Sequence, residues 1–257
     1  MTDLAWTFRG DRSFAAIGQH FLTHDPADLV MLYMSLPDVA GHRFWRYHAP
    51  GDFDYEIDAA EIEMFGDYIH TAYELFDSQL GELLKHWPAE GNVIVLSDHG
   101  MHADLETRDD PEAITSGHHQ TGPGGLFAVA GPAFAKGGNL LGRARNSKGL
   151  VGDVKGVAPL VLQLLGIAVP KHWDYARREN PLVDLLDADW AARFPARRGP
   201  NPDAAWREAN PPGLPIDPGA GQSDLFIEAF TALGYIDSEQ GGSADGPSAN
   251  GDSAEGE

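Results

Sequence analysis

The stretch from Asn92 to His102, NVIVLSDHGMH, constrains the fold of this chain more than any other. Its apolar run, Val93 to Leu96, is typical of a buried strand. The run ends abruptly in the polar sequence Ser97-Asp98-His99-Gly100. In open α/β folds, ligands bind just beyond the carboxyl ends of the strands. A buried strand that runs directly into an Asp and a His therefore predicts a metal or ligand site at the edge of a sheet.

Two further Asp/His clusters lie on either side of this stretch in the sequence. The apolar run Asp28 to Ser35 predicts a second buried strand, and it is followed by Asp38 and, four residues later, by His42. The third cluster is Gly117-His118-His119. Taken singly, the clusters are more often explained without a metal: the Asp-His pairs by a helix cap or loop hydrogen bonding, and His118-His119 as surface loop histidines. Because carboxylates and imidazoles are the ligands of zinc-class ions, the three together predict one metal site.

The clearest predicted helix, Ala59 to His86, links the two predicted strands. Its apolar residues recur at steps of three and four, which gives the helix one apolar face. A helix of this length between two strands defines a βαβ unit, in which the strands are parallel. The predicted fold class is therefore α/β, with a mostly parallel central sheet flanked by helices. The apolar residues of the helix are Ile62, Phe65, Ile69, Tyr73, Phe76, Leu80 and Leu83.

The remaining segments predict three regions along the chain. We expect a metal-binding core over residues 1–175, an irregular extension with one short helix over 176–236, and a disordered acidic tail over 237–257. Within the core, residues 14–22 and 153–165 have helical spacing and 125–130 predict a third strand. Residues 43–58 are rich in aromatics and turn formers, so a loop over the mouth of a site is expected there. The short helix of the extension is predicted at 223–233.

The composition excludes several classes of function. The 257 residues carry a net charge of -21, which argues against a nucleic-acid surface built from basic patches and against docking to anionic membranes. The chain has no cysteine, so disulfides and thiolate metal ligands are excluded. No apolar run approaches the ~18 residues of a membrane span, and the N-terminus has no signal-peptide pattern. Cytoplasmic localisation is the default expectation.

The three blocks LYMSLPDVAGH, VIVLSDHGM and SGHHQTGPGGLFAVAGPAF resemble the alkaline phosphatase superfamily, and within it the type I phosphodiesterase/nucleotide pyrophosphatase branch. A fourth block, GDVKGVAPLVLQLLGIAVPKHWD, is similar to the closing helix of that family. The resemblance extends from about residue 10 to residue 175. It implies the α/β fold of the superfamily, incomplete at its N-terminal side in this chain.

The resemblance also implies a metal-dependent hydrolase that acts on a small phosphoric ester. Two divalent ions, zinc or manganese, would be bound at neighbouring positions. One ion would activate a water molecule and the other would activate a nucleophile. The implied ligands are Asp38, His42 and His119 for the first ion, and Asp98 and His99 for the second.

The choice of His119 over His118 follows the family spacing Ser-Gly-x-His, which Ser116 to His119 matches. The family also has a further Asp ligand and a Thr or Ser nucleophile before the first block. Only 37 residues precede Asp38, and neither Asp3 nor Asp11 follows an apolar strand. We therefore expect the C-terminal portion of the family domain, with the nucleophile and the substrate-binding residues unidentified.

Two alternatives remain open from the sequence. Without its nucleophile, the chain would be a catalytically inactive metal-binding fragment or pseudoenzyme. A less favoured alternative is a relative of sulfatases or phosphoglycerate mutases within the same superfamily. Sulfatases modify a Cys or Ser within a characteristic motif, and this chain has neither a Cys nor a matching Ser motif.

Overall fold

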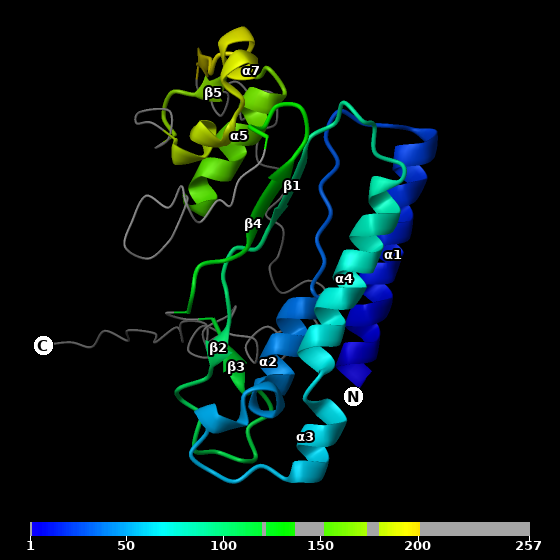
Figure 1. Cartoon of the computed structure of the whole chain (residues 1–257), viewed down its shortest axis with the longest axis vertical. Coiled ribbons are helices and arrows are strands. Elements are labelled where there is room, and N and C mark those ends of the chain that lie inside the picture. The colour runs from blue at the N-terminus through cyan, green and yellow to red at the C-terminus, as the bar shows by residue number, and fades with distance from the viewer. Residues whose placement is uncertain (1, 120–121, 137–151, 174–179, 201–257) are drawn as a thin grey trace, which may run out of the picture. The chain divides into compact units, whose positions relative to one another are not determined.

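The computed structural model describes residues 2–119, 122–136, 152–173 and 180–200 (Figure 1). The helices of the first part of the chain are α1 (Thr2–His24), α2 (Leu36–His48), α3 (Ala59–Phe65) and α4 (Tyr68–Leu84), with a short 3-10 turn, η1 (Pro50–Asp52). Helices α1, α2 and α4 contact one another pairwise (Figure 1). Their shared core is a small apolar cluster of Leu36, Ala40, Ile69 and Ala72, against which Phe8, Phe44, Trp45 and Leu75 pack.

Helix α2 begins at Leu36 because its first turn is favoured both by a neighbouring residue and by a residue far away in the sequence. Pro37 occupies the first turn, where its missing N–H costs nothing. The Ser35 side chain makes no capping hydrogen bond. Instead, the buried carboxylate of Asp11 on α1 accepts hydrogen bonds from the backbone N–H of Ser35 at 3.0 Å and of Leu36 at 2.9 Å. A residue far away in sequence thus satisfies N–H groups that have no partner within the helix.

In the described part of the chain, the strands form three two-stranded sheets. Strand β1 (Val93–Leu96) pairs antiparallel with β4 (Phe127–Ala130), in a register that places Ile94 opposite Val129 and Leu96 opposite Phe127. Strand β2 (His102–Ala103) pairs antiparallel with β3 (Gly117–His118). Strand β5 (Val169–Pro170) pairs parallel with β6 (Arg198–Gly199).

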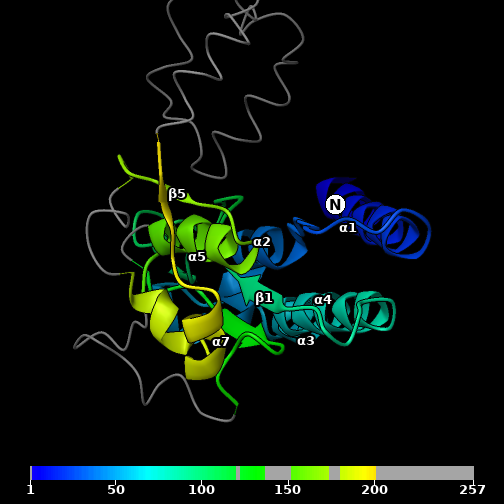
Figure 2. The same cartoon turned by 90° about the horizontal axis from the view of Figure 1, so that it is seen from above.

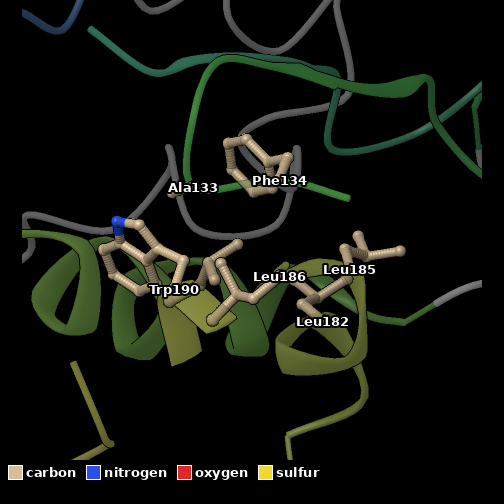
Figure 3. Close-up of a cluster of buried hydrophobic side chains, with 7 residues drawn as sticks. Ala133, Phe134, Leu182, Leu185, Leu186 and Trp190 are labelled. Carbon is tan, nitrogen blue, oxygen red and sulfur yellow. The ribbon is translucent and has the colours of Figure 1, made fainter. Parts of the chain in front are cut away.

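A second apolar cluster joins β1 and β4 to the helices that follow them in sequence. These are η3 (Val154–Gly156), α5 (Val157–Leu164), η4 (Pro181–Leu185) and α7 (Ala188–Arg193). In Figure 2, α5 and α7 lie beside the β1–β4 pair, and Ile94, Phe127 and Val129 of these strands pack against the cluster. The buried members, shown in Figure 3, are Ala133, Phe134, Leu160, Leu182, Leu185, Leu186 and Trp190.

The structure corrects the predicted sheet. The described residues are mixed helix and strand, in keeping with an incomplete α/β fold, but the mostly parallel central sheet is not found among them. Residues 28–35 belong to no strand, and β1 pairs antiparallel with β4 instead. An apolar run becomes a strand only when a neighbour accepts its backbone hydrogen bonds. Here the run is extended but exposed, with Met31 at 82% of its full accessibility.

The predicted loop after this run is also wrong in its first part. Residues 36–48 form α2, so Asp38 and His42 lie on a helix instead of following a strand end. The predicted helix over 59–86 is confirmed but divided into α3 and α4 near Gly66. The strand at Val93–Leu96 is confirmed, as are a strand within 125–130 and helical structure within 153–165.

The extension beyond residue 175 is described only in part. Between 180 and 200 it contains η4, α7 and β6, where irregular structure was expected. The predicted helix at 223–233 and the predicted disordered tail at 237–257 lie outside the described residues. Among the described residues, none of the helices combines the length and the hydropathy that a membrane span requires.

Candidate metal centre

Asp38 and His42 lie one turn apart on α2, so both side chains project from the same face of the helix. The Nε2 atom of His42 is 3.6 Å from the Oδ1 atom of Asp38. The His42 side chain is 1% exposed and that of Asp38 is 18% exposed. Helix α2 therefore presents a nearly buried imidazole beside a carboxylate.

The neighbouring backbone decides which nitrogen of His42 carries the proton. Nδ1 donates a hydrogen bond of 2.7 Å to the carbonyl oxygen of Gly117, a group that can only accept. Burial lowers the pKa of His42 below its ordinary value of 6.5, although the Asp38 carboxylate opposes this by raising it. A neutral ring with its proton on Nδ1 leaves the lone pair of Nε2 directed at Asp38. Two electron-rich atoms that face each other in a buried place are suited to a cation between them.

His99 follows β1 and repeats this arrangement. Its Nδ1 donates to the Gly100 carbonyl oxygen at 3.1 Å. Its Nε2 is 3.9 Å from Oδ1 of Asp38 and 3.6 Å from Oδ1 of Asp98. The Asp98 side chain is 71% exposed, so it lies at the rim of the group. His99 is thus nearly as close to the carboxylate on α2 as to the Asp that precedes it in sequence.

His119 follows β3 and lies between the other two imidazoles. Its ring centroid is 5.3 Å from that of His42 and 4.0 Å from that of His99, on which it stacks. The centroid of His118 is 5.9 Å from that of His42. His118 also belongs to β3 itself, where it is paired with His102 of β2. Of the two adjacent histidines, His119 is therefore the better placed beside the other site residues.

The donor atoms suit a divalent ion in chemistry and approximately in spacing. Within the described residues, the buried Nε2 atoms of His42 and His99 have no hydrogen-bond partner. Tetrahedral zinc ligands are roughly 3.3 to 3.6 Å apart, compared with 3.6, 3.6 and 3.9 Å between the three nitrogen–oxygen pairs above. The described residues nevertheless contain no group of three or more side chains arranged to hold a metal ion. The donor set fits, and its members stand slightly too far apart for ligation.

The hydroxyl groups near these residues are largely engaged with the backbone. Ser97 Oγ accepts a hydrogen bond from the Leu126 N–H at 2.7 Å. Thr107 donates to the Thr115 carbonyl at 3.3 Å. Ser116 is fully buried against α2. Ser97 is exposed, whereas Thr107 is partly buried and Ser116 is buried.

Two residues that build this region, Asp11 and Arg46, were not predicted from the sequence. Asp38, His42 and Arg46 stand at four-residue steps, a spacing that places all three on one helical face. That signal was obscured because residues 36–42 were interpreted as the end of a strand. Asp11 gave no local signal, because its role is to cap a helix that begins 25 residues later.

Comparison with protein families assigns the chain to a class. The family model for type I phosphodiesterase / nucleotide pyrophosphatase matches residues 4–199, and the chain belongs to this family. The resemblance seen in the sequence blocks is thereby confirmed. The family consists of enzymes that hydrolyse phosphoric esters. No curated protein and no solved structure matches the chain.

Proposed function

We propose that the chain is a metal-dependent hydrolase of small phosphoric esters, with two divalent ions, zinc or manganese, held by Asp38, His42, Asp98, His99 and His119. The observation that carries the proposal is the pairing of Asp38 with His42. A buried imidazole, held in one tautomer by Gly117, directs an unprotonated nitrogen at a carboxylate 3.6 Å away. Such a pair is favourable when a cation lies between the two groups.

The family resemblance divides the residues into two groups. Asp38, His42 and His119 would hold one ion, and Asp98 with His99 would contribute to the other. His99 lies 3.9 Å from Asp38, which supports neighbouring ions over distant ones. Bound ions of this kind polarise phosphoryl oxygens and lower the pKa of a coordinated water.

The chain's own residues orient this site. The Gly117 and Gly100 carbonyls hold the His42 and His99 rings by Nδ1 and leave both Nε2 atoms directed at Asp38. The net charge of -21 is no obstacle to this function, because bound cations would dominate the local field and attract an anionic ester.

A second candidate function is metal binding without hydrolysis. It is favoured by the engagement of the Ser97, Thr107 and Ser116 hydroxyls with the backbone. The two functions differ in what they require. Both require the five ligands, whereas hydrolysis also requires a nucleophile at the phosphorus.

Equilibrium zinc and manganese binding, followed by hydrolysis of bis(4-nitrophenyl) phosphate, separates these possibilities. The proposal expects His42→Gln, His119→Gln and Asp38→Asn to weaken zinc binding strongly and to abolish hydrolysis. His70→Gln is the matched control, because His70 is an exposed histidine of α4. Zinc binding without hydrolysis would favour the second candidate. Zinc affinity unchanged in all three ligand variants would overturn both.

A further inference from the structure

A buried arginine lies one helical turn beyond His42. Arg46 is 6% exposed, and its guanidinium Nη1 donates to the Pro111 carbonyl oxygen at 2.7 Å. The Nη2 atom donates to the carbonyl oxygen of Ala113. Its Cζ lies 5.9 Å from the centroid of the Tyr55 ring. Within the described part of the chain it forms no ion pair with a carboxylate, so backbone carbonyls of the segment that precedes β3 hold this charge.

The same segment ends in a serine that is joined to the turn of α2 carrying His42. Ser116 is fully buried, and its backbone N–H donates to the His42 carbonyl at 2.7 Å. Its Oγ accepts from the Arg46 N–H at 3.1 Å and donates to the Arg43 carbonyl at 3.4 Å. Three hydrogen bonds from one residue therefore join the start of β3 to a single turn of the helix.

Immediately after Ser116, the two backbones approach as closely as glycine permits. A Cβ atom on Gly117 would lie 2.2 Å from the Gly41 carbonyl oxygen. Gly117 also supplies the carbonyl that accepts the Nδ1 proton of His42. The next residues are His118 and His119. Whatever holds residues 111–116 against α2 thus determines the distance between the Gly117 carbonyl and His42, and the place of His119.

We infer that Arg46 is a positioning residue of the candidate metal centre: it holds residues 111–116 against α2, and through Ser116 and Gly117 it orients His42 and His119. The inference rests on the proposed function for its connection to metal binding. The part of the inference that concerns the orientation of His42 can be tested in the metal-free protein.

Stability alone does not account for this arginine. A buried charge is costly to desolvate, and replacing such groups by apolar side chains is often neutral or stabilising. Arg46 instead fixes the position of residues 111–116 relative to α2, because its planar guanidinium donates hydrogen bonds to two carbonyl oxygens at once. Partners that orient metal ligands typically change metal affinity by 10- to 100-fold when they are removed.

Three variants and one matched control test the inference. Arg46→Met removes both carbonyl contacts and keeps an unbranched side chain about as long as the aliphatic stem of arginine, whereas Arg46→Lys keeps the charge and loses the fork. Ser116→Ala removes the hydroxyl contacts by a smaller change. The control is Arg108→Met, which removes an exposed arginine of the same segment that pairs with Asp54. The readouts are the tautomer of His42, from ¹⁵N chemical shifts of the metal-free protein, and the Kd for zinc.

Wild-type protein is expected to hold His42 with its proton on Nδ1. In Arg46→Met the His42 ring should exchange between its two tautomers, so the ¹⁵N chemical shifts of Nδ1 and Nε2 should approach a common average. The Kd for zinc should rise about 10-fold or more. Both readouts of Arg46→Lys should lie between those of wild type and Arg46→Met. Adding Ser116→Ala to Arg46→Met should change them little, because both residues act through the same junction between residues 111–116 and α2. Arg108→Met should leave both readouts unchanged.

A wild-type tautomer and a zinc Kd within about 2-fold of wild type in Arg46→Met would overturn the inference. If Arg46→Met does not fold, unchanged readouts in both Arg46→Lys and Ser116→Ala would do the same. If wild-type protein binds no zinc, the proposed function fails while the tautomer still decides whether Arg46 orients His42.

Discussion

Two regions of this molecule are equally well buried and are held by different forces. The cluster around Leu160 and Trp190 consists of apolar side chains only (Figure 3). The junction between α2 and the segment 104–117 buries polar side chains, each bonded to backbone groups. Its members are His42, Arg46, Asp104 and Ser116, and Asp11 plays the same part at the start of α2.

The difference indicates which contacts contribute most to the stability of this fold and which contacts fix the arrangement of its segments. Apolar burial contributes about 25 cal/mol per Å² and depends little on orientation. Buried hydrogen bonds contribute little net energy, but leaving one group unsatisfied is costly, so they restrict the arrangement. Two candidate ligands, Asp38 and His42, lie on the helix of the second region, and none of the five belongs to the apolar cluster. Changes in the apolar cluster should therefore affect the free energy of unfolding, and changes at the junction should affect metal affinity.

The largest expected effect on stability comes from Leu160→Ala. Leu160 is 0% exposed, so the truncation leaves a cavity in the apolar cluster. We expect a loss of about 2–5 kcal/mol in the free energy of unfolding, measured by urea denaturation. Zinc affinity of the folded protein should be unchanged. A large change in zinc affinity would show that the two regions do not act separately.

Gly117→Ala should affect both quantities. The added Cβ would lie 2.2 Å from the Gly41 carbonyl oxygen, so α2 and β3 must move apart. We expect a loss of about 1–3 kcal/mol in unfolding free energy, together with weaker zinc binding. Gly81→Ala is the control, because nothing lies within 4 Å of its added Cβ in α4. That change should stabilise the protein by about 1 kcal/mol.

Asp11→Ala should remove the carboxylate on α1 that caps the first turn of α2. The N–H groups of Ser35 and Leu36 would lose their acceptor, which costs about 1–2 kcal/mol. Asp38 lies in the first turn of this helix, so zinc affinity should fall as well. Asp11→Asn keeps one acceptor oxygen and should lose less. Equal stability of all three proteins by urea denaturation would refute this role.

The pH dependence of stability should report on the buried state of His42. Burial lowers its pKa in the folded protein, so below the unfolded value of 6.5 the unfolded chain takes up a proton more readily. Stability should therefore be fully present above pH 6.5, decrease as the pH falls and level off below the folded pKa. Each unit of lowering corresponds to about 1.4 kcal/mol. His42→Gln should remove this contribution in urea denaturation measured from pH 8 to pH 5.

The smallest effect is expected at the exposed ion pair of Arg108 with Asp54, whose Nη2 and Oδ1 atoms are 2.8 Å apart. Solvent and salt screen such pairs, so Asp54→Asn should cost less than about 1 kcal/mol. The change should shrink further at high salt. A larger loss would mean that the 104–116 segment depends on its surface contacts as much as on Arg46.

Much of the candidate site was readable from residue types and spacing. The five proposed ligands were named from their sequence blocks, and the structure places Asp38, His42, His99 and His119 close together with Asp98 at the rim. The strand at Val93–Leu96 and the apolar helix after residue 59 were predicted because their patterns are local. Family membership follows from the same blocks.

The sequence by itself named the residues that are proposed to carry the chemistry, and the tertiary structure decided how they are held. Whether residues 28–35 become a strand depends on a hydrogen-bonding neighbour, which no local pattern supplies. The helical state of 36–48 depends in part on Asp11, and the tautomer of His42 depends on a carbonyl 75 residues away. Residue type and periodicity are local properties, whereas capping, pairing and burial are contacts between distant segments. That is why the proposed ligands could be named in advance, and the roles of Asp11 and Arg46 could not.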